Sequence, residues 1–163
     1  MKKRILSVCF AALLVFSMPF FSTRQVEAAA DEPILDGSRL IQEDESIGYD
    51  TKITKGVDLL TGYSKIVRLG PGKIYAGGTT IAAHVVENIQ VSVIVERAQE
   101  GDTSWATYDG WHKENVNTDR VGSNRALDVE GGYYYRVRCT HSANSDMSSS
   151  FNRRCLRRRT ITI

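Results

Sequence analysis

The sequence predicts an all-β protein built as an antiparallel sandwich. Three observations lead to this prediction: short β-rich runs recur from residue 52 onward, turn residues separate them, and no stretch keeps a helical period. In the clearest run, residues 89–97, four β-branched residues share one face: Ile89, Val91, Val93 and Val95. Alternation with a period of two is typical of a half-buried strand.

Residues 1–30 have the three parts of a secretory signal peptide. A basic start precedes an apolar run over residues 5–21, and Ala28-Ala29-Ala30 provides a small-residue cleavage site before Asp31. An uncleaved membrane anchor is the alternative, which the shortness of the run and its small-residue end disfavour. We therefore expect a secreted or cell-surface, extracellular protein, and the basic start and length are typical of bacteria.

The rest of the chain divides into three parts. Residues 31–50 are acidic and poor in apolar side chains, which predicts a mostly mobile leader, with room for a short helix around residues 38–43. Residues 51–152 form the predicted sandwich domain, with strands at 63–69, 73–76 continuing into 79–83, 89–97, 104–111, 125–129 and 133–142. Its predicted turns lie at Gly70-Pro71-Gly72, Gly77-Gly78, Gly101-Asp102 and Gly131-Gly132. Residues 153–163 form an Arg-rich C-terminal segment with a candidate last strand at 160–163.

Charge is distributed unevenly along the chain. The whole chain carries +2, the signal segment +3 and the last eleven residues +5, so residues 31–152 carry −6. An acidic body argues against nucleic-acid binding, which needs a basic face on the fold. Five arginines make up the basic end: Arg153, Arg154, Arg157, Arg158 and Arg159. This segment has three interpretations: it associates with anionic cell-wall polymers or lipid headgroups, it is a protease-sensitive extension, or it is a charged edge beside the last strand.

Two cysteines remain after signal cleavage, Cys139 and Cys155. Export permits a disulfide between them. The alternative is two free thiols, with Cys139 packed as a small apolar residue. No C-x-x-C motif is present, so neither a structural zinc site nor a thioredoxin-like site is expected.

A search for catalytic chemistry finds no motif. His84, His112 and His141 lie 28 and 29 residues apart, without the spacing of a metal-ligating pair. No G-x-S-x-G elbow is present. Cys139 and His141 lie two apart on one predicted strand, about 7 Å between Cα atoms, which is too far for a nucleophile–base pair. We therefore expect a protein that is not an enzyme and uses no metal or cofactor.

Aromatic residues remain as candidates for ligand binding. We single out Tyr108, Trp111 and Tyr134 as a potential binding surface for a protein or glycan. Trp111 follows Asp109-Gly110, a turn signal, which places it at a strand end near a loop. The competing interpretation, that aromatics fill the core, is stronger for Trp105 and about equally strong for Tyr108 and Trp111.

The segment Gly131-Gly132-Tyr133-Tyr134-Tyr135-Arg136-Val137-Arg138 resembles the F strand of fibronectin type III and immunoglobulin-like domains. With residues 72–80, 91–97 and Trp105, it resembles small secreted proteins of uncharacterised function from Gram-positive bacteria. The resemblance covers residues 51–142 and implies an immunoglobulin-like sandwich with a tyrosine corner, a buried tyrosine that bonds to nearby backbone. The spacing from Leu127 favours Tyr133 over Tyr135 for this role. The resemblance implies no activity.

These observations lead to two expectations of function. The first is an extracellular, non-catalytic recognition module for a protein or a glycan. The second is a secreted structural or surface-associated protein held by its charge, without a specific small ligand. A contiguous apolar-aromatic surface favours the first, and an evenly charged surface favours the second.

Overall fold

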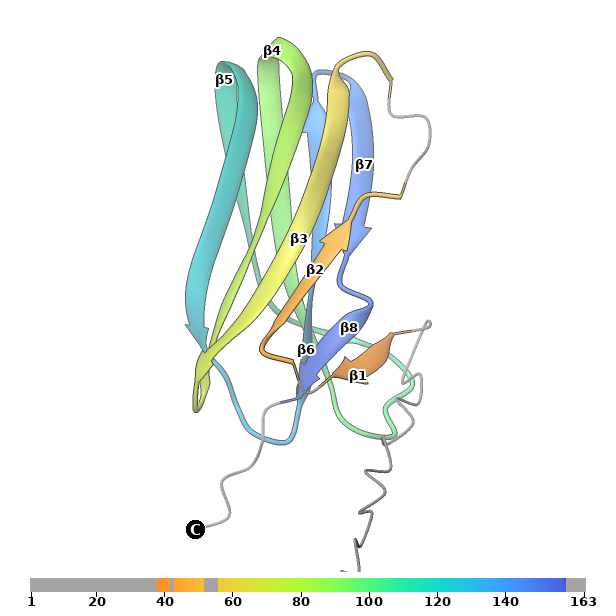
Figure 1. Ribbon diagram of the computed structural model, residues 1–163, viewed down its shortest axis with the longest axis vertical. Coiled ribbons are helices and arrows are strands. Elements are labelled where there is room, and N and C mark those ends of the chain that lie inside the picture. Colours follow the sequence, from red (N-terminus) through yellow and green to blue (C-terminus); the bar gives the residue numbers. More distant parts are fainter. Residues whose placement is uncertain (1–37, 42, 52–55, 158–163) are drawn as a thin grey trace, which may run out of the picture. The chain divides into compact units, whose positions relative to one another are not determined.

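A computed structural model describes residues 38–41, 43–51 and 56–157, all within the unit Asp31–Ile163. The predicted signal peptide, most of the predicted leader and the candidate strand at 160–163 lie outside these residues. The described chain has no helix and forms eight strands (Figure 1): β1 Arg39–Ile41, β2 Glu45–Tyr49, β3 Leu59–Gly70, β4 Lys73–Ala98, β5 Ala106–Asp128, β6 Tyr134–Ala143, β7 Asp146–Phe151 and β8 Arg154–Arg157. The all-β, antiparallel prediction is confirmed, except that the short β1 runs parallel to β8.

The two long strands, β4 and β5, each belong to both layers of the fold. Residues 73–81 of β4 pair with β3 on one side and with residues 120–128 of β5 on the other. After a break in register between Ile81 and Val86, β4 pairs with residues 106–118 of β5 and with β6. Figure 1 shows both strands turning over at the top of the molecule. The first layer is therefore β2–β3–β4–β5, and the second is β5–β4–β6 with β7 and β8 beyond β6.

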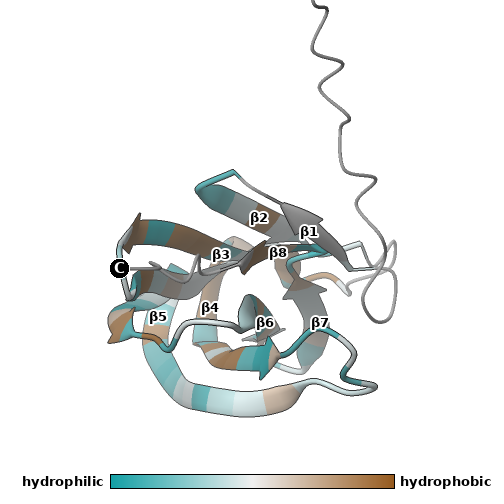
Figure 2. Ribbon diagram, turned by 90° about the horizontal axis from the view of Figure 1, so that it is seen from below, coloured by the Kyte–Doolittle hydropathy of each residue, from teal (hydrophilic) through white to brown (hydrophobic). Residues whose placement is uncertain are grey.

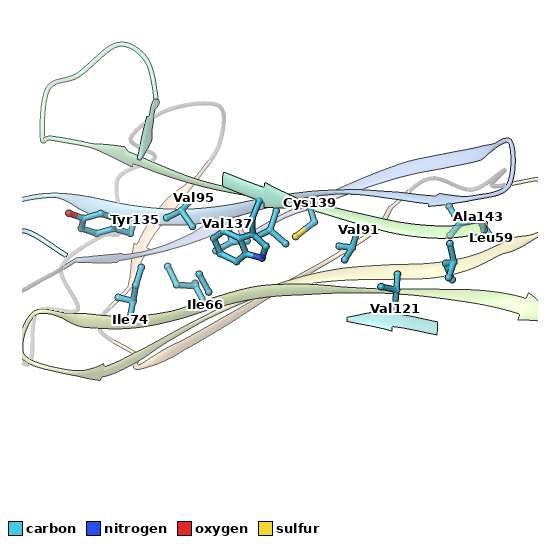
Figure 3. Close-up of a cluster of buried hydrophobic side chains, with 14 of the residues drawn as sticks. Leu59, Ile66, Ile74, Val91, Val95, Val121, Tyr135, Val137, Cys139 and Ala143 are labelled. Carbon is cyan, nitrogen blue, oxygen red and sulfur yellow. The ribbon is translucent and has the colours of Figure 1, made fainter. Parts of the chain in front are cut away.

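The core lies between the two layers. The predicted apolar face of residues 89–97 is confirmed, because all four β-branched residues on it are fully buried. Side chains from both layers meet there (Figure 3), and from below the strands are seen to surround this core (Figure 2). The central members are Ile66, Ile74, Val91, Val95, Val121, Tyr135 and Val137. Burial of this apolar surface is the main force holding the layers together.

Two glycines let the layers approach closely. A Cβ on Gly78 would lie 2.4 Å from the Cys139 sulfur, and a Cβ on Gly62 would lie 2.3 Å from the His141 ring. The predicted turn at Gly77-Gly78 is therefore wrong, because both glycines lie inside β4. Gly78 leaves room for Cys139 of the opposite layer, whereas a Cβ on Gly77 would lie 2.7 Å from Asn124 Cβ on the neighbouring strand β5. The other three predicted turns are confirmed, and Gly72, Gly101 and Gly132 each have a positive φ.

Side chains join the two layers where no backbone ladder does. Along β5, Trp111 Nε1 donates to Ser123 Oγ at 3.1 Å. Lys113 Nζ donates to the carbonyl oxygen of Gly122 at 3.1 Å. These bonds join the two arms of β5 and occupy edge groups that would otherwise be open to another chain.

On the opposite side, the buried Asn152 joins the two layers. Its Oδ1 accepts from the Val137 backbone N–H at 3.1 Å, while its Nδ2 donates to the carbonyl oxygens of Ser46 and Ser64 at 2.9 and 3.3 Å. This single side chain therefore holds β2 and β3 against β6. A buried amide that is fully hydrogen-bonded in this way specifies one arrangement of the strands.

Several local predictions are corrected. Residues 39–41 and 45–49 of the expected mobile leader form β1 and β2, and β1 replaces the short helix considered around 38–43. β1 pairs with β8, which comes from the Arg-rich segment. The chain does not turn at Asp109-Gly110, because Gly110 pairs with Ile94 inside a continuous β4–β5 ladder. In each case, pairing with a strand that is distant in the sequence determines the local conformation.

Candidate functional site

Trp111 lies in the core and not at an exposed strand end. Only 9% of it is exposed, its indole N–H is bonded to Ser123, and the guanidinium of Arg125 lies 4.8 Å from the ring centre. Its predicted position is therefore wrong. Its partner Val93 faces inward, and a residue opposite an inward-facing residue shares that face.

Tyr108 and Tyr134 do not form a common surface with Trp111. Tyr108 lies at a break in the β4–β5 register, where its hydroxyl donates to the carbonyl oxygen of Asp128 at 2.6 Å and its ring meets Tyr135 edge-on at 5.5 Å. Tyr134 is 1% exposed. Trp111 and Tyr134 are thus buried, and Tyr108 is partly buried and held by its hydroxyl bond and its contact with Tyr135.

The tyrosine that bonds to nearby backbone is Tyr135, not Tyr133. The Tyr135 hydroxyl accepts from the backbone N–H of Glu130 at 3.1 Å and donates to the carbonyl oxygen of the same residue at 3.2 Å. Burial raises the pKa of Tyr135. Tyr133 is only partly buried and lies beneath the Arg97 guanidinium, 4.5 Å from it. The prediction of Tyr133 is wrong. Tyr133 and Tyr135 lie two residues apart and their rings are 6.4 Å from each other, but Tyr133 precedes β6 and stays partly exposed, whereas Tyr135 lies inside the strand and is buried.

His141 spans the interior between the layers. Its Nδ1 lies 2.9 Å from Thr80 Oγ1, and its Nε2 lies 2.8 Å from Ser150 Oγ. The Thr80 hydroxyl donates its proton to the Gln90 carbonyl oxygen at 2.8 Å, so His141 Nδ1 must carry a hydrogen and donate to Thr80. All three side chains are fully or almost fully buried, which makes this chain of bonds a structural link and not a catalytic triad open to substrate.

Cys139 and Cys155 are both buried, and the disulfide considered from the sequence is not formed between them. The strand register explains this. Tyr135 pairs with Leu156, which places Cys155 level with Arg136, three residues or about 10 Å along β6 from Cys139. A disulfide needs Cα atoms within about 7 Å. Burial raises the pKa of Cys139 to about 12, which makes it an inert thiol.

Arg153 and Arg154, the arginines of the C-terminal segment whose side chains the structure describes, have different partners. Arg153 is exposed and stacks on Phe151, with 5.3 Å between its guanidinium carbon and the ring centre. Arg154 is paired with Glu43 at 3.0 Å. The backbone of Arg157 pairs with Tyr134 in the β6–β8 ladder, and Arg158 and Arg159 lie outside the described residues.

The described chain has an aromatic surface that the sequence did not reveal. It lies on the outer side of β2, β3 and the first part of β4, and we call it the tyrosine face. Its members are Ile47, Tyr49, Tyr63, Lys65, Val67 and Tyr75. The register aligns Tyr49 with Tyr63 and Val67 with Tyr75, so these side chains share one side of the sheet. Tyr49 is 62% exposed, and none of the six is buried.

An ion pair occupies the middle of the tyrosine face. Lys65 Nζ lies 2.9 Å from Glu45 Oε1. The pKa of Lys65 is raised because the hydrogen bond and charge of Glu45 outweigh its partial desolvation, with smaller contributions from the nearby Tyr75 and Tyr63. The face therefore has no net charge at neutral pH. It presents aromatic rings, phenolic hydroxyls and an ammonium–carboxylate pair side by side on the adjacent strands β2, β3 and β4.

A catalytic or metal site has no comparable support. Across residues 38–41, 43–51 and 56–157, no three His, Cys, Asp or Glu side chains are grouped so as to hold a metal ion. His84 is paired with Asp58 at 3.0 Å, and His112 lies 3.3 Å from the Ser92 hydroxyl. None of the described segments is a helix with the length and apolar character needed to cross a membrane.

In comparisons with known proteins, no family model, no curated protein and no solved structure matches this chain. The tyrosine face is the strongest candidate, because it combines exposure, aromatic rings and hydrogen-bonding groups on a rigid sheet.

Proposed function

We propose that this protein is a secreted, non-catalytic recognition module that binds a glycan on the tyrosine face. The observation that carries the proposal is the alignment of Tyr49 with Tyr63 and of Tyr75 with Val67 on one exposed side of the first layer. A contiguous group of exposed aromatic side chains often marks a binding site. A sheet face that only contacts solvent can be covered by charged residues instead.

The chemistry of the face favours a neutral sugar. The C–H side of a pyranose ring packs on an aromatic ring, and its hydroxyl groups need both hydrogen-bond donors and acceptors. Tyrosine supplies an apolar ring with a polar end, while Lys65 donates and Glu45 accepts. Because Lys65 and Glu45 neutralise each other, a strongly charged polymer gains nothing on this face.

Two further elements of the proposal rest on sequence. The signal-peptide pattern of residues 1–30 supports export to the extracellular space, where glycans are abundant. The bond between Tyr135 and Glu130 supports the resemblance of residues 131–138 to the corner strand of immunoglobulin-like domains. The turned-over strands β4 and β5 differ from that pattern, so we propose the likeness for this corner and not for the complete topology.

Electrophoresis through gels that contain neutral polysaccharides tests the proposal. We expect at least one neutral polysaccharide to retard the protein, and Tyr49→Ala to remove most of the retardation without changing the melting temperature. Val116→Ala is the control, because Val116 is similarly exposed but lies on β5, outside the tyrosine face. Retardation that Tyr49→Ala leaves unchanged would overturn the proposal, as would binding only to a protein ligand.

A further inference from the structure

A second group of side chains lies on the outer side of the other layer, over β6 and β7. Arg136 lies between two rings, with its guanidinium carbon 4.3 Å from the centre of Trp105 and 5.7 Å from that of Phe151. Arg153 lies over the same Phe151 ring at 5.3 Å. We call these four side chains the arginine ladder. Such stacking fixes guanidinium groups that would otherwise move freely.

One buried carboxylate serves two of the arginines on this face. The buried Glu96 accepts from Arg136 Nε at 2.6 Å through one carboxylate oxygen and lies 2.9 Å from Arg138 Nη2 through the other. Both oxygens of this carboxylate are thus occupied. Arg136 and Arg138 therefore share one buried carboxylate, and the exposed Arg153 lies beside them on the same face, over Phe151.

Two of these guanidiniums are accessible to a ligand. The Arg138 side chain is 48% exposed, and Arg153 is exposed and has no carboxylate partner among the described residues. Phe151 is directly opposite Arg138 in the β6–β7 ladder, so the ring that supports Arg153 is next to Arg138. The next pair on the same side of this ladder, Thr140 and Ser149, adds two exposed hydroxyl groups.

From this arrangement we infer a second binding site, formed by Arg138 and Arg153 beside Phe151, for the phosphate groups of an anionic polymer. This site goes beyond the proposed function, because it lies on the other layer and takes a ligand of opposite character. A tetrahedral phosphate has enough acceptor oxygens for two guanidinium forks and a hydroxyl. Stacking on Phe151 fixes Arg153 before binding, which reduces the entropy lost when the ligand is held.

The probe is short-chain inorganic polyphosphate, titrated calorimetrically into the purified protein at two ionic strengths. We expect binding that weakens as salt is added, since the site works by charge. Arg153→Gln should weaken binding by about tenfold or more, because it removes a charge-assisted pair of hydrogen bonds. Arg154→Gln is the matched control: it removes one adjacent, exposed arginine that is paired with Glu43, and should change the affinity by less than about twofold.

Comparison of the variants separates a defined phosphate site from attraction to general positive charge. An equal loss of affinity in the Arg153 and Arg154 variants would overturn the proposal, because it would show that any nearby arginine serves. Absence of polyphosphate binding would also overturn it, as would binding only to vesicles of anionic lipid. Tyr49→Ala should leave polyphosphate affinity unchanged, so failure of this site and failure of the glycan site are distinguishable.

Discussion

The rings of Tyr49 and Tyr63 lie 6.1 Å apart across the β2–β3 ladder and are tilted by 52° to each other. This contact joins an edge strand of only five residues to the rest of the tyrosine face. β2 pairs with β3 on one side, and its other attachment includes the bond from Asn152 to the Ser46 carbonyl oxygen. The position of Tyr49 therefore depends on a buried side chain in the opposite layer.

Asn152→Ala should loosen β2 and lower the free energy of unfolding. The change leaves the buried Val137 N–H and two carbonyl oxygens without their side-chain partner. We expect a loss of about 2–4 kcal/mol, measured by chemical denaturation. Asn124→Ala, at an exposed amide on β5, is the control and should cost little. A variant at position 152 as stable as the parent would refute this account of how β2 is held.

Tyr135→Phe should destabilise the protein more than Tyr133→Phe. The Tyr135 hydroxyl makes both bonds to the Glu130 backbone, so its removal should cost about 1–2 kcal/mol in the free energy of unfolding. Chemical denaturation of the two variants measures the difference. Equal effects of the two changes would contradict the assignment of Tyr135 as the corner tyrosine. They would favour Tyr133, which its spacing from Leu127 indicates.

Stability should fall at alkaline pH because of Cys139. Its pKa is raised from 9.0 to about 12 in the folded protein by burial. Above pH 9 the unfolded chain loses the thiol proton while the folded chain keeps it, so the contribution is fully present below pH 9 and is lost as pH rises toward 12. The slope from this group approaches about 1.4 kcal/mol per pH unit. Cys139→Ala should flatten the denaturation profile over this range, and an unchanged profile would contradict the assignment.

The tautomer of His141 is a direct test of the buried hydrogen-bond chain. Because Thr80 donates to Gln90, the imidazole should carry its hydrogen on Nδ1. Long-range nitrogen–proton NMR correlations distinguish the two neutral tautomers. We also expect Thr80→Val to cost about 1–3 kcal/mol, since it removes the hydroxyl that accepts from the buried Nδ1–H. Detection of a hydrogen on Nε2 alone would show that the hydrogen bonds between Thr80, His141 and Ser150 run in the opposite direction.

Local patterns in the sequence were sufficient for much of the fold. The alternation of Ile89, Val91, Val93 and Val95 correctly identified a buried strand face, and the turns at Gly72, Gly101 and Gly132 follow from glycine's access to positive φ. Gly77-Gly78 carried the same local signal but lies inside a strand, because the space above Gly78 is filled by Cys139 from another layer. A close approach of this kind depends on tertiary packing and leaves no local trace.

The candidate site was harder to predict than the fold. Tyr49, Tyr63 and Tyr75 come from three different strands, and only the register of β2, β3 and β4 brings them to one face. The alternation of Tyr63, Lys65 and Val67 was the one available signal, but it did not show which side of the strand faces solvent. Trp111 was misplaced for the same reason, since its burial follows from pairing with Val93.

The most direct test of the proposed glycan site is NMR of the tyrosine ring signals during titration with a neutral oligosaccharide that the gel assay identifies. The account predicts concentration-dependent shifts of Tyr49, Tyr63 and Tyr75, while the rings of Tyr108 and Tyr134 stay unchanged. Tyr49→Phe should retain most of the affinity because it keeps the ring, and Tyr49→Ala should weaken binding by about threefold or more. Shifts confined to Tyr108 and Tyr134, with Tyr49 unaffected, would contradict the central claim that the β2–β3–β4 surface binds the sugar.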